Sequence, residues 1–233
     1  MNRDLGVTEA IRRAVPEWTV SLFDAIALLG DEFVVVAVLL GIAAAEAVRS
    51  VRRDVDRPLS RRTGFVLGVV LGGLALTLLL KTAFGFSRPP ESLQAIPREG
   101  EGFPSGHTMA ATILWGALAL RSRTSTHRRR LLAAALLVGL VGLSRLVLGV
   151  HYFVDIVASV GFGAGYLLAT EAALDGDPER AFAVAVALGG LSLIVTGGAT
   201  DGLLAFAGCV GGAAGWLALN RPAVRNLWST LAQ

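Results

Sequence analysis

Long stretches without a charged side chain dominate this sequence. The clearest cover residues 63–80, 181–200 and 202–220, and shorter ones cover 33–45, 108–120, 131–144 and 156–170. A helix needs about 20 apolar residues to cross the hydrocarbon core of a bilayer, so the shorter runs must be extended by flanking residues that include charges. Since only 17% of the residues are charged and 54% are hydrophobic, an ordinary soluble domain is excluded. We predict an all-α, polytopic bundle of about six to seven transmembrane helices.

Two arginine-rich loops predict how this bundle is oriented. Residues 49–62 carry six arginines and residues 121–130 carry five. Short loops rich in Lys and Arg stay on the cytoplasmic side of a membrane, so both loops are expected inside the cell. Seven spans then place residues 83–104 outside. We expect a multi-pass protein of the cell membrane with an external amino terminus and a cytoplasmic carboxyl terminus.

The first thirty residues are too polar for a further span. Glu9, Arg12 and Arg13 interrupt them, and no compact apolar core precedes a small-residue cleavage pattern, so a cleaved signal peptide is not expected. We interpret residues 1–30 as an amphipathic, interfacial segment with Trp18 near the lipid headgroups. Cys209 is the single cysteine, which excludes a disulfide within the chain and a thiolate metal site.

Polar residues gather at the ends of four of the expected spans. In the predicted topology all of these ends lie at the outer face. Each residue alone has an ordinary interpretation: Lys81 as a snorkelling lysine, Arg88 as a solvated loop residue, Arg145 with Asp155 as an interhelical ion pair, and a lone histidine as a satisfied polar group. Their convergence indicates a functional site, because ionisable groups at a membrane are costly. The residues are Lys81, Arg88, Pro104, Ser105, Gly106, His107, Ser144, Arg145, His151 and Asp155.

Three cations and two histidines at one face favour a phosphate ligand. Lysine offers a point charge, and arginine offers a planar fork that matches two phosphate oxygens. The Ser105–Gly106 turn opens a helix, whose first N–H groups and dipole attract anions, and Gly106 allows a close backbone approach. Lys81 is also the only lysine in a chain with twenty arginines.

The two histidines indicate the chemistry. His151 and Asp155 are four residues apart, so on a helix they share a face and the carboxylate can accept the Nδ1 proton. This leaves Nε2 as a nucleophile. His107, from a different helix, can protonate a departing alkoxide as a general acid. Such a pair of imidazoles requires no metal.

The segments that carry these residues resemble a known family. "KTAFGFSRP" (81–89), "PSGH" (104–107) and "SRLVLGVHYFVD" (144–155) are similar to the three signature motifs of the type 2 phosphatidic acid phosphatase (PAP2) family, K-x6-RP, PSGH and SR-x5-H-x3-D. Order and spacing both match, and no signature position departs from the pattern. The resemblance covers the second to the fifth expected span.

The resemblance implies a metal-independent phosphatase without a cofactor, working through a phosphohistidine. His151 would be the nucleophile, Asp155 would orient it, and His107 would be the acid and then the base. The relatives include soluble haloperoxidases that hold vanadate, but the membrane spans here favour the lipid branch. We expect three parts: 1–30 as the interfacial segment, 31–173 as a PAP2-type catalytic core and 174–233 as two additional transmembrane helices. The phosphate-binding residues implied are Lys81, Arg88, Ser105, Gly106 and Arg145, with Pro89, Pro104 and Ser144 in support.

The expected partners are membrane lipids and a lipid phosphate or diphosphate substrate, and nothing indicates nucleic acid. Phosphatidic acid-like lipids, phosphatidylglycerophosphate and polyprenyl phosphates or diphosphates all fit, and the oligomeric state is left open. We expect loop 90–103, with Glu91, Glu99, Glu101 and Arg98, to cover the site. Two alternatives remain at this point: a lipid phosphotransferase using the same phosphohistidine, and a transporter of a phosphorylated solute.

Overall fold

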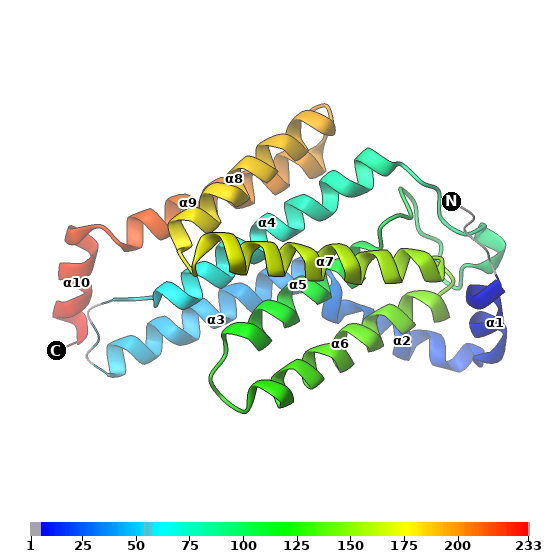
Figure 1. Cartoon of the computed structure of the whole chain (residues 1–233), viewed down its shortest axis with the longest axis horizontal. Coiled ribbons are helices and arrows are strands. Elements are labelled where there is room, and N and C mark those ends of the chain that lie inside the picture. Colours follow the sequence, from blue (N-terminus) through cyan, green and yellow to red (C-terminus); the bar gives the residue numbers. More distant parts are fainter. Residues whose placement is uncertain (1–5, 54, 56, 233) are drawn as a thin grey trace. The chain divides into compact units, whose positions relative to one another are not determined.

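The computed structural model describes residues 6–53, 55 and 57–232, so residues 1–5 of the expected interfacial segment lie outside the described residues. Within these ranges the chain forms helices and no strand, which confirms the all-α prediction (Figure 1). The elements are α1 (Gly6–Ala14), η1 (Glu17–Thr19), α2 (Val20–Ala27), η2 (Leu28–Gly30), α3 (Glu32–Arg52), α4 (Arg61–Phe84), η3 (Glu91–Leu93), α5 (Gly106–Arg121), α6 (His127–Val147), α7 (Phe153–Leu174), α8 (Pro178–Val195), α9 (Thr200–Leu219) and α10 (Pro222–Ala232).

Six of the described helices are long and apolar enough to cross a membrane: α3, α4, α6, α7, α8 and α9. The seventh uncharged run, 108–120, lies in α5, which has only 16 residues because Ser105 caps its start and Ser122 ends it. At 1.5 Å per residue α5 is about 24 Å long. Most of its first half is fully buried, so this helix lies among other helices of the protein. The chain is therefore a multi-helix membrane protein.

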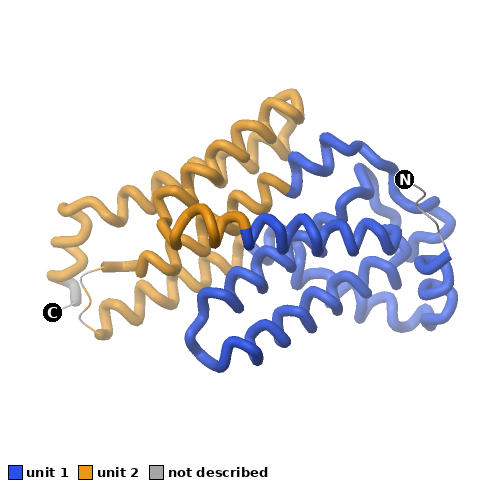
Figure 2. The backbone as a smooth tube through the Cα atoms, in the orientation of Figure 1, with its two compact units in different colours: residues 1–35, 77–168 blue, residues 36–76, 169–233 orange. Residues whose placement is uncertain are grey.

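The chain forms two compact units, shown in different colours in Figure 2. One unit contains residues 1–35 and 77–168, and the other contains residues 36–76 and 169–233. The chain passes from one unit to the other within α3, α4 and α7. All positions of the three motifs fall within the first unit.

The second unit contains a hairpin of α8 and α9. Asp177 caps α8 by accepting the N–H groups of Glu179 and Arg180, and Gly197 and Gly198 take positive φ values in the turn before α9. Arg61, at the start of α4, donates two hydrogen bonds to the Glu179 carboxylate, at 3.1 and 2.8 Å. These contacts join α4 and α8 at their first turns.

In the first unit the N-terminal elements pack against the central helices. α1 and α2 contact α6, and η2 lies against α5 and α6. The Trp115 indole N–H of α5 donates to the Leu29 carbonyl at 3.0 Å. At Gly30 a Cβ atom would come within 2.2 Å of the His107 carbonyl oxygen, so glycine is required there by a close approach of two backbones. The N-terminal segment is thus part of the packing around the motif residues.

This close approach gives a stability prediction. In Gly30→Ala the new methyl group meets a backbone oxygen that no side-chain rotation can move, and overpacking of this kind costs about 1–3 kcal/mol. Gly139→Ala in α6 is the matched control, because nothing lies within 4 Å of its added Cβ. We expect thermal unfolding in detergent, followed by circular dichroism, to occur at a lower temperature for Gly30→Ala only. Equal unfolding temperatures for both variants would contradict the close approach.

Candidate active site

The motif residues meet where several helix ends of the first unit come together. Lys81 lies in the last turn of α4, and Arg88 follows in the loop. Ser105, Gly106 and His107 open α5. The end of α6 and the start of α7 supply the rest, namely Ser144, Arg145, His151 and Asp155. The contacts described below bring these segments together, as the three motifs predicted.

His151 precedes α7, whereas the sequence placed it on the helix itself. The helix begins at Phe153 because the Asp155 carboxylate accepts the Tyr152 N–H at 2.8 Å, the side-chain half of a capping box. Upstream, α6 ends at Val147, and Gly149, two residues later, has a positive φ of 69° that reverses the chain. His151 therefore stands in a short turn between two helices and is only 1% exposed.

The hydrogen bonds of His151 define its tautomer. Its Nδ1 lies 2.7 Å from the Gly102 carbonyl oxygen, which can only accept, and its Nε2 lies 3.3 Å from Nη1 of Arg88, which can only donate. The proton therefore sits on Nδ1, and Nε2 carries the lone pair. Asp155 Oδ2 is 3.5 Å from Nδ1. Gly102 is an acceptor that sequence reasoning missed, because a backbone carbonyl leaves no side-chain pattern.

Burial keeps this imidazole neutral near pH 7. It lowers the pKa of His151 to about 4, while the hydrogen bond with Asp155 opposes the shift and the positive charges of Arg145 and Arg88 add to it. An imidazole can act as a nucleophile only in its neutral form, and this is the form that burial favours here.

Arg145 is the most unusual side chain of the site. It is 1% exposed, and within the described part of the chain its Nε and Nη1 atoms have no hydrogen-bond partner. A pair with Asp155, considered above, does not account for these two nitrogens. Buried donors without a partner are costly, so these two nitrogens favour the binding of an anion beside them.

Arg88 is held by backbone carbonyls. Its Nε donates to the Glu99 carbonyl at 3.0 Å and its Nη1 donates to the Val150 carbonyl at 3.2 Å, besides its contact with His151. Burial lowers the pKa of Arg88, and the nearby charge of Arg98 lowers it further. Neutral acceptors leave the positive charge of the guanidinium available to an anion.

The start of α5 faces Lys81. A Cβ at Gly106 would lie 3.9 Å from the Lys81 ammonium nitrogen, an ordinary contact, so glycine is not required here by neighbouring protein atoms. Ser105 is buried and uses its hydroxyl oxygen to accept the Thr108 N–H at 3.4 Å as the helix cap. The first N–H groups of a helix have no partner within it, so they and Lys81 attract an anion to the same place.

His107 has a carboxylate beside it that the motifs do not include. Its Nε2 is 3.8 Å from Oδ2 of Asp31, whose Oδ1 accepts the Phe33 N–H at 3.0 Å and so caps α3. The sequence signal is an Asp two residues before the apolar run 33–45, which predicts a helix cap but not a contact with α5.

The three supporting residues have structural contacts. Ser144 is buried and donates to the Val141 carbonyl one turn earlier, at 2.6 Å. Pro89 is buried, and its carbonyl accepts the Gln94 side-chain N–H at 2.8 Å. Pro104 is also buried, and its peptide bond with Phe103 is cis.

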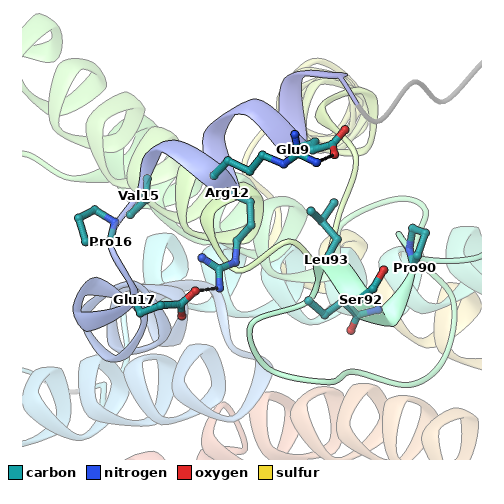
Figure 3. A pocket seen from close by; sticks show the side chains of 10 residues that line it. Glu9, Arg12, Val15, Pro16, Glu17, Pro90, Ser92 and Leu93 are labelled. Carbon is teal, nitrogen blue, oxygen red and sulfur yellow. Dashed lines mark hydrogen bonds and ion pairs between the residues drawn. The ribbon is translucent and has the colours of Figure 1, made fainter.

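A separate cavity of about 560 Å³ lies between α1 and the segment after Pro89 (Figure 3). Its arginines are already paired, Arg12 with Glu17 at 2.6 Å and Arg13 with Glu9 at 2.5 Å. No motif residue lines it, so it is distinct from the cation cluster. The lining residues are Glu9, Arg12, Arg13, Val15, Pro16, Glu17, Pro90, Ser92, Leu93 and Gln94.

Comparisons with known proteins agree with this arrangement. A family model described as the PAP2 superfamily matches residues 62–174. A lipid A 1-phosphatase from Rhizobium johnstonii is 34% identical over 111 residues, which are 44% of this chain and 43% of that protein. The chain thus matches less than half of the length of this curated relative.

A likeness in fold accompanies the likeness in sequence. The crystal structure of Aquifex aeolicus LpxE superimposes with a TM-score of 0.53, covering 71% of this chain and 93% of that one, at 22% sequence identity. The matched residues 62–174 contain all three motifs in order. Residues 62–174, just under half of the chain, therefore match the PAP2 superfamily.

Proposed function

We propose that this chain hydrolyses a lipid phosphate or diphosphate in the membrane through a phosphohistidine on His151. The observation that carries the proposal is the buried Arg145, whose Nε and Nη1 lack a hydrogen-bond partner among the described residues, in the same cluster as a neutral imidazole that carries its lone pair on Nε2. The match of residues 62–174 to the PAP2 superfamily supports it.

The proposed phosphate-binding set surrounds the transferred group with positive charge. Arg145 and Lys81 bind non-bridging oxygens together with the first N–H groups of α5, which Ser105 holds in place as the cap. Arg88 donates to His151 Nε2 when no ligand is bound. On binding, its Nη1 moves to a phosphate oxygen and releases the lone pair.

In the first chemical step, Nε2 of His151 forms a bond to phosphorus as the bond from phosphorus to the lipid oxygen breaks. The imidazole becomes positively charged, and the Gly102 carbonyl at Nδ1 and the nearby Asp155 carboxylate stabilise it. His107 gives its proton to the departing oxygen.

In the second step, His107 takes a proton from a water molecule as that water attacks phosphorus. The P–N bond breaks, its electron pair returns to Nε2, and inorganic phosphate leaves. No metal takes part in either step of this proposal. His107 carries the proton before the first step and again after the second, and its Nε2 lies 3.8 Å from the Asp31 carboxylate.

A lipid substrate agrees with the position of the site at the ends of membrane helices. Since the relative from Rhizobium johnstonii is a lipid A 1-phosphatase, lipid A carrying its 1-phosphate is the first substrate to test. Phosphatidic acid, phosphatidylglycerophosphate and polyprenyl phosphates or diphosphates complete the panel.

We further propose that the site faces the extracytoplasmic side. The connection between α5 and α6 has arginines on both flanks and is assigned to the cytoplasm by its charge. His107 and Arg145 lie at the opposite ends of these two helices. If each of the helices α6 to α9 crosses the membrane once, the carboxyl terminus lies in the cytoplasm.

The activity itself gives a prediction about Arg145. Purified protein should release inorganic phosphate from at least one lipid of the panel with excess chelator present. Arg145→Met should lower kcat/KM by about 30-fold or more, since losing a desolvated charge contact to phosphate costs about 2–5 kcal/mol. Without phosphate its unfolding temperature should not fall, because the change removes an unpaired buried cation.

Arg145→Lys is the matched variant for this experiment. It keeps the charge but loses the planar fork, so its activity should be nearly as low as that of Arg145→Met. A strict magnesium requirement, or an Arg145→Met protein with full turnover, would refute the proposed mechanism. Phosphate transfer to an added alcohol without net release would indicate a phosphotransferase.

Trapping the phosphorylated intermediate distinguishes the proposed roles of the two histidines. His151→Ala should show neither turnover nor a phosphoryl label. His107→Ala lacks the acid and base, so an activated aryl phosphate, whose leaving group needs no proton, should label His151 slowly while dephosphorylation stalls. Mass spectrometry of quenched protein should find an acid-labile, base-stable group on His151. A label on His107 or on a serine would show that the roles are assigned wrongly.

The orientation is tested with single exposed cysteines. A membrane-impermeant thiol reagent applied to intact cells should label Ser92→Cys, in the loop between α4 and α5, but not Ser125→Cys, in the loop between α5 and α6. The unmodified chain is the blank, because its Cys209 is buried. Reversed labelling would place the site on the cytoplasmic side.

A further inference from the structure

Outside the three motifs, one more cation lies beside the site. Arg98 belongs to the loop between α4 and α5, and it is the largest charged influence on the pKa of Arg88 after burial, lowering it. The family motifs give it no role. It is only partly buried, with 43% of its side chain exposed.

Backbone contacts hold Arg98 close to Arg88. The Arg98 N–H donates to the Gln94 side-chain oxygen at 2.9 Å, and the Gln94 side-chain N–H donates to the Pro89 carbonyl at 2.8 Å. On the other side, the carbonyl of Glu99 accepts Nε of Arg88 at 3.0 Å. The segment 94–99 is therefore tied on both sides of Arg98 to Arg88 or to the residue next to it.

The rest of this loop is also anchored, so the position of Arg98 is defined. The Ala95 N–H donates to the Leu148 carbonyl at 3.0 Å, and the Gly102 N–H donates to the Phe86 carbonyl at 2.6 Å. The Phe86 and Phe103 rings pack with centroids 5.4 Å apart. Loop 90–103, expected to cover the site, is thus held against the α6–α7 turn, with Arg98 attached next to the cation cluster.

The guanidinium of Arg98 has a weak partner that a ligand can replace. Its Nη2 lies 3.5 Å from Oδ1 of Asp24 in α2, and the Asp24 side chain is 40% exposed. An exposed pair at this distance contributes little. A more highly charged anion next to Arg88 competes well against this carboxylate.

We propose that Arg98 is a specificity-determining residue. When substrate binds, the Arg98 guanidinium gives up its contact with Asp24 and binds a second anionic group of the substrate, next to the phosphoryl group that is transferred. This inference rests on the proposed phosphatase function of the same site. The motif cations Lys81, Arg88 and Arg145 surround the first phosphate, and Arg98 adds a fourth charge near Arg88. A diphosphate head, or a head with a second phosphate or carboxylate close by, matches this arrangement.

Binding of inorganic anions tests the proposal without requiring turnover. Calorimetric titration should show that the purified full chain binds pyrophosphate more tightly than orthophosphate. Arg98→Gln should weaken pyrophosphate binding about tenfold or more, since a charge-assisted hydrogen bond is lost, and should weaken orthophosphate binding much less. Arg123→Gln, in the loop between α5 and α6, is the control and should bind both anions as the unmodified chain does.

The Asp24→Asn variant shows whether Arg98 binds the ligand or only anchors its loop through the pair with Asp24. If Arg98 serves the ligand, removing its competitor carboxylate should keep or tighten pyrophosphate binding. If the Arg98–Asp24 pair only anchors the loop, Asp24→Asn and Arg98→Gln should weaken both anions alike, and that result would overturn the proposal. Equal affinities of the unmodified chain for the two anions would also overturn it.

Kinetics on matched lipids distinguish this inference from the proposed function. With farnesyl phosphate and farnesyl diphosphate, Arg98→Gln should lower kcat/KM for the diphosphate about tenfold more than for the monophosphate. If neither lipid is hydrolysed while the pyrophosphate preference depends on Arg98, the phosphatase proposal fails and the binding role of Arg98 stands. Equal losses on both lipids would refute the specificity role.

Discussion

An excess of positive charge at buried helix ends is the constraint on which the rest of this site depends. Lys81 and Arg145 occupy the last turns of α4 and α6, where the negative end of each helix dipole favours a cation. The start of α5, beside Lys81, has the opposite polarity and favours an anion. The helix directions therefore reduce the cost of the cations and favour an anion beside the start of α5.

The groups that orient the reactive side chains are mostly uncharged. The carbonyls of Glu99 and Val150 hold Arg88, and the carbonyl of Gly102 accepts from His151 Nδ1. A carboxylate in any of these places would neutralise the cluster and compete with a phosphate. The Asp155 carboxylate accepts the Tyr152 N–H as well, so part of its charge stabilises the start of α7. The carbonyl acceptors therefore position Arg88 and His151 without cancelling the charge of Arg88.

The sequence predicted those features that depend on local patterns. Each uncharged run became a helix, and the ends of α4, α5 and α6 lie close to Lys81, Ser105 and Arg145. The motifs also predicted which side chains meet, since their order and spacing belong to one family. Local patterns failed where caps decide the boundary: α5 has only 16 residues, and α7 starts after His151 because Asp155 caps it.

Contacts made by backbone atoms or by distant segments could not be predicted from patterns. Gly102 and His151 are 49 residues apart, and the acceptor is a carbonyl that every residue type possesses. Asp31 was recognisable as a helix cap, but its distance of 3.8 Å from His107 depends on how η2 packs on α5. In the sequence, Arg98 is only one charge of a loop with charges of both signs. The positions of these residues relative to the site are determined by tertiary packing and not by a local sequence pattern.

The N-terminal segment shows how far the scaffold of the site extends beyond the family match. Thr8 is buried and donates its hydroxyl to the His151 carbonyl at 3.2 Å, and Gly30 lies against the His107 carbonyl. Both contacts come from residues before 62, where the family model begins. The backbones of both candidate catalytic histidines therefore rest on a segment that the family domain does not define. Asp24 and Asp31, which approach Arg98 and His107, also lie outside the matched region, whereas all the motif residues, from Lys81 to Asp155, lie inside it.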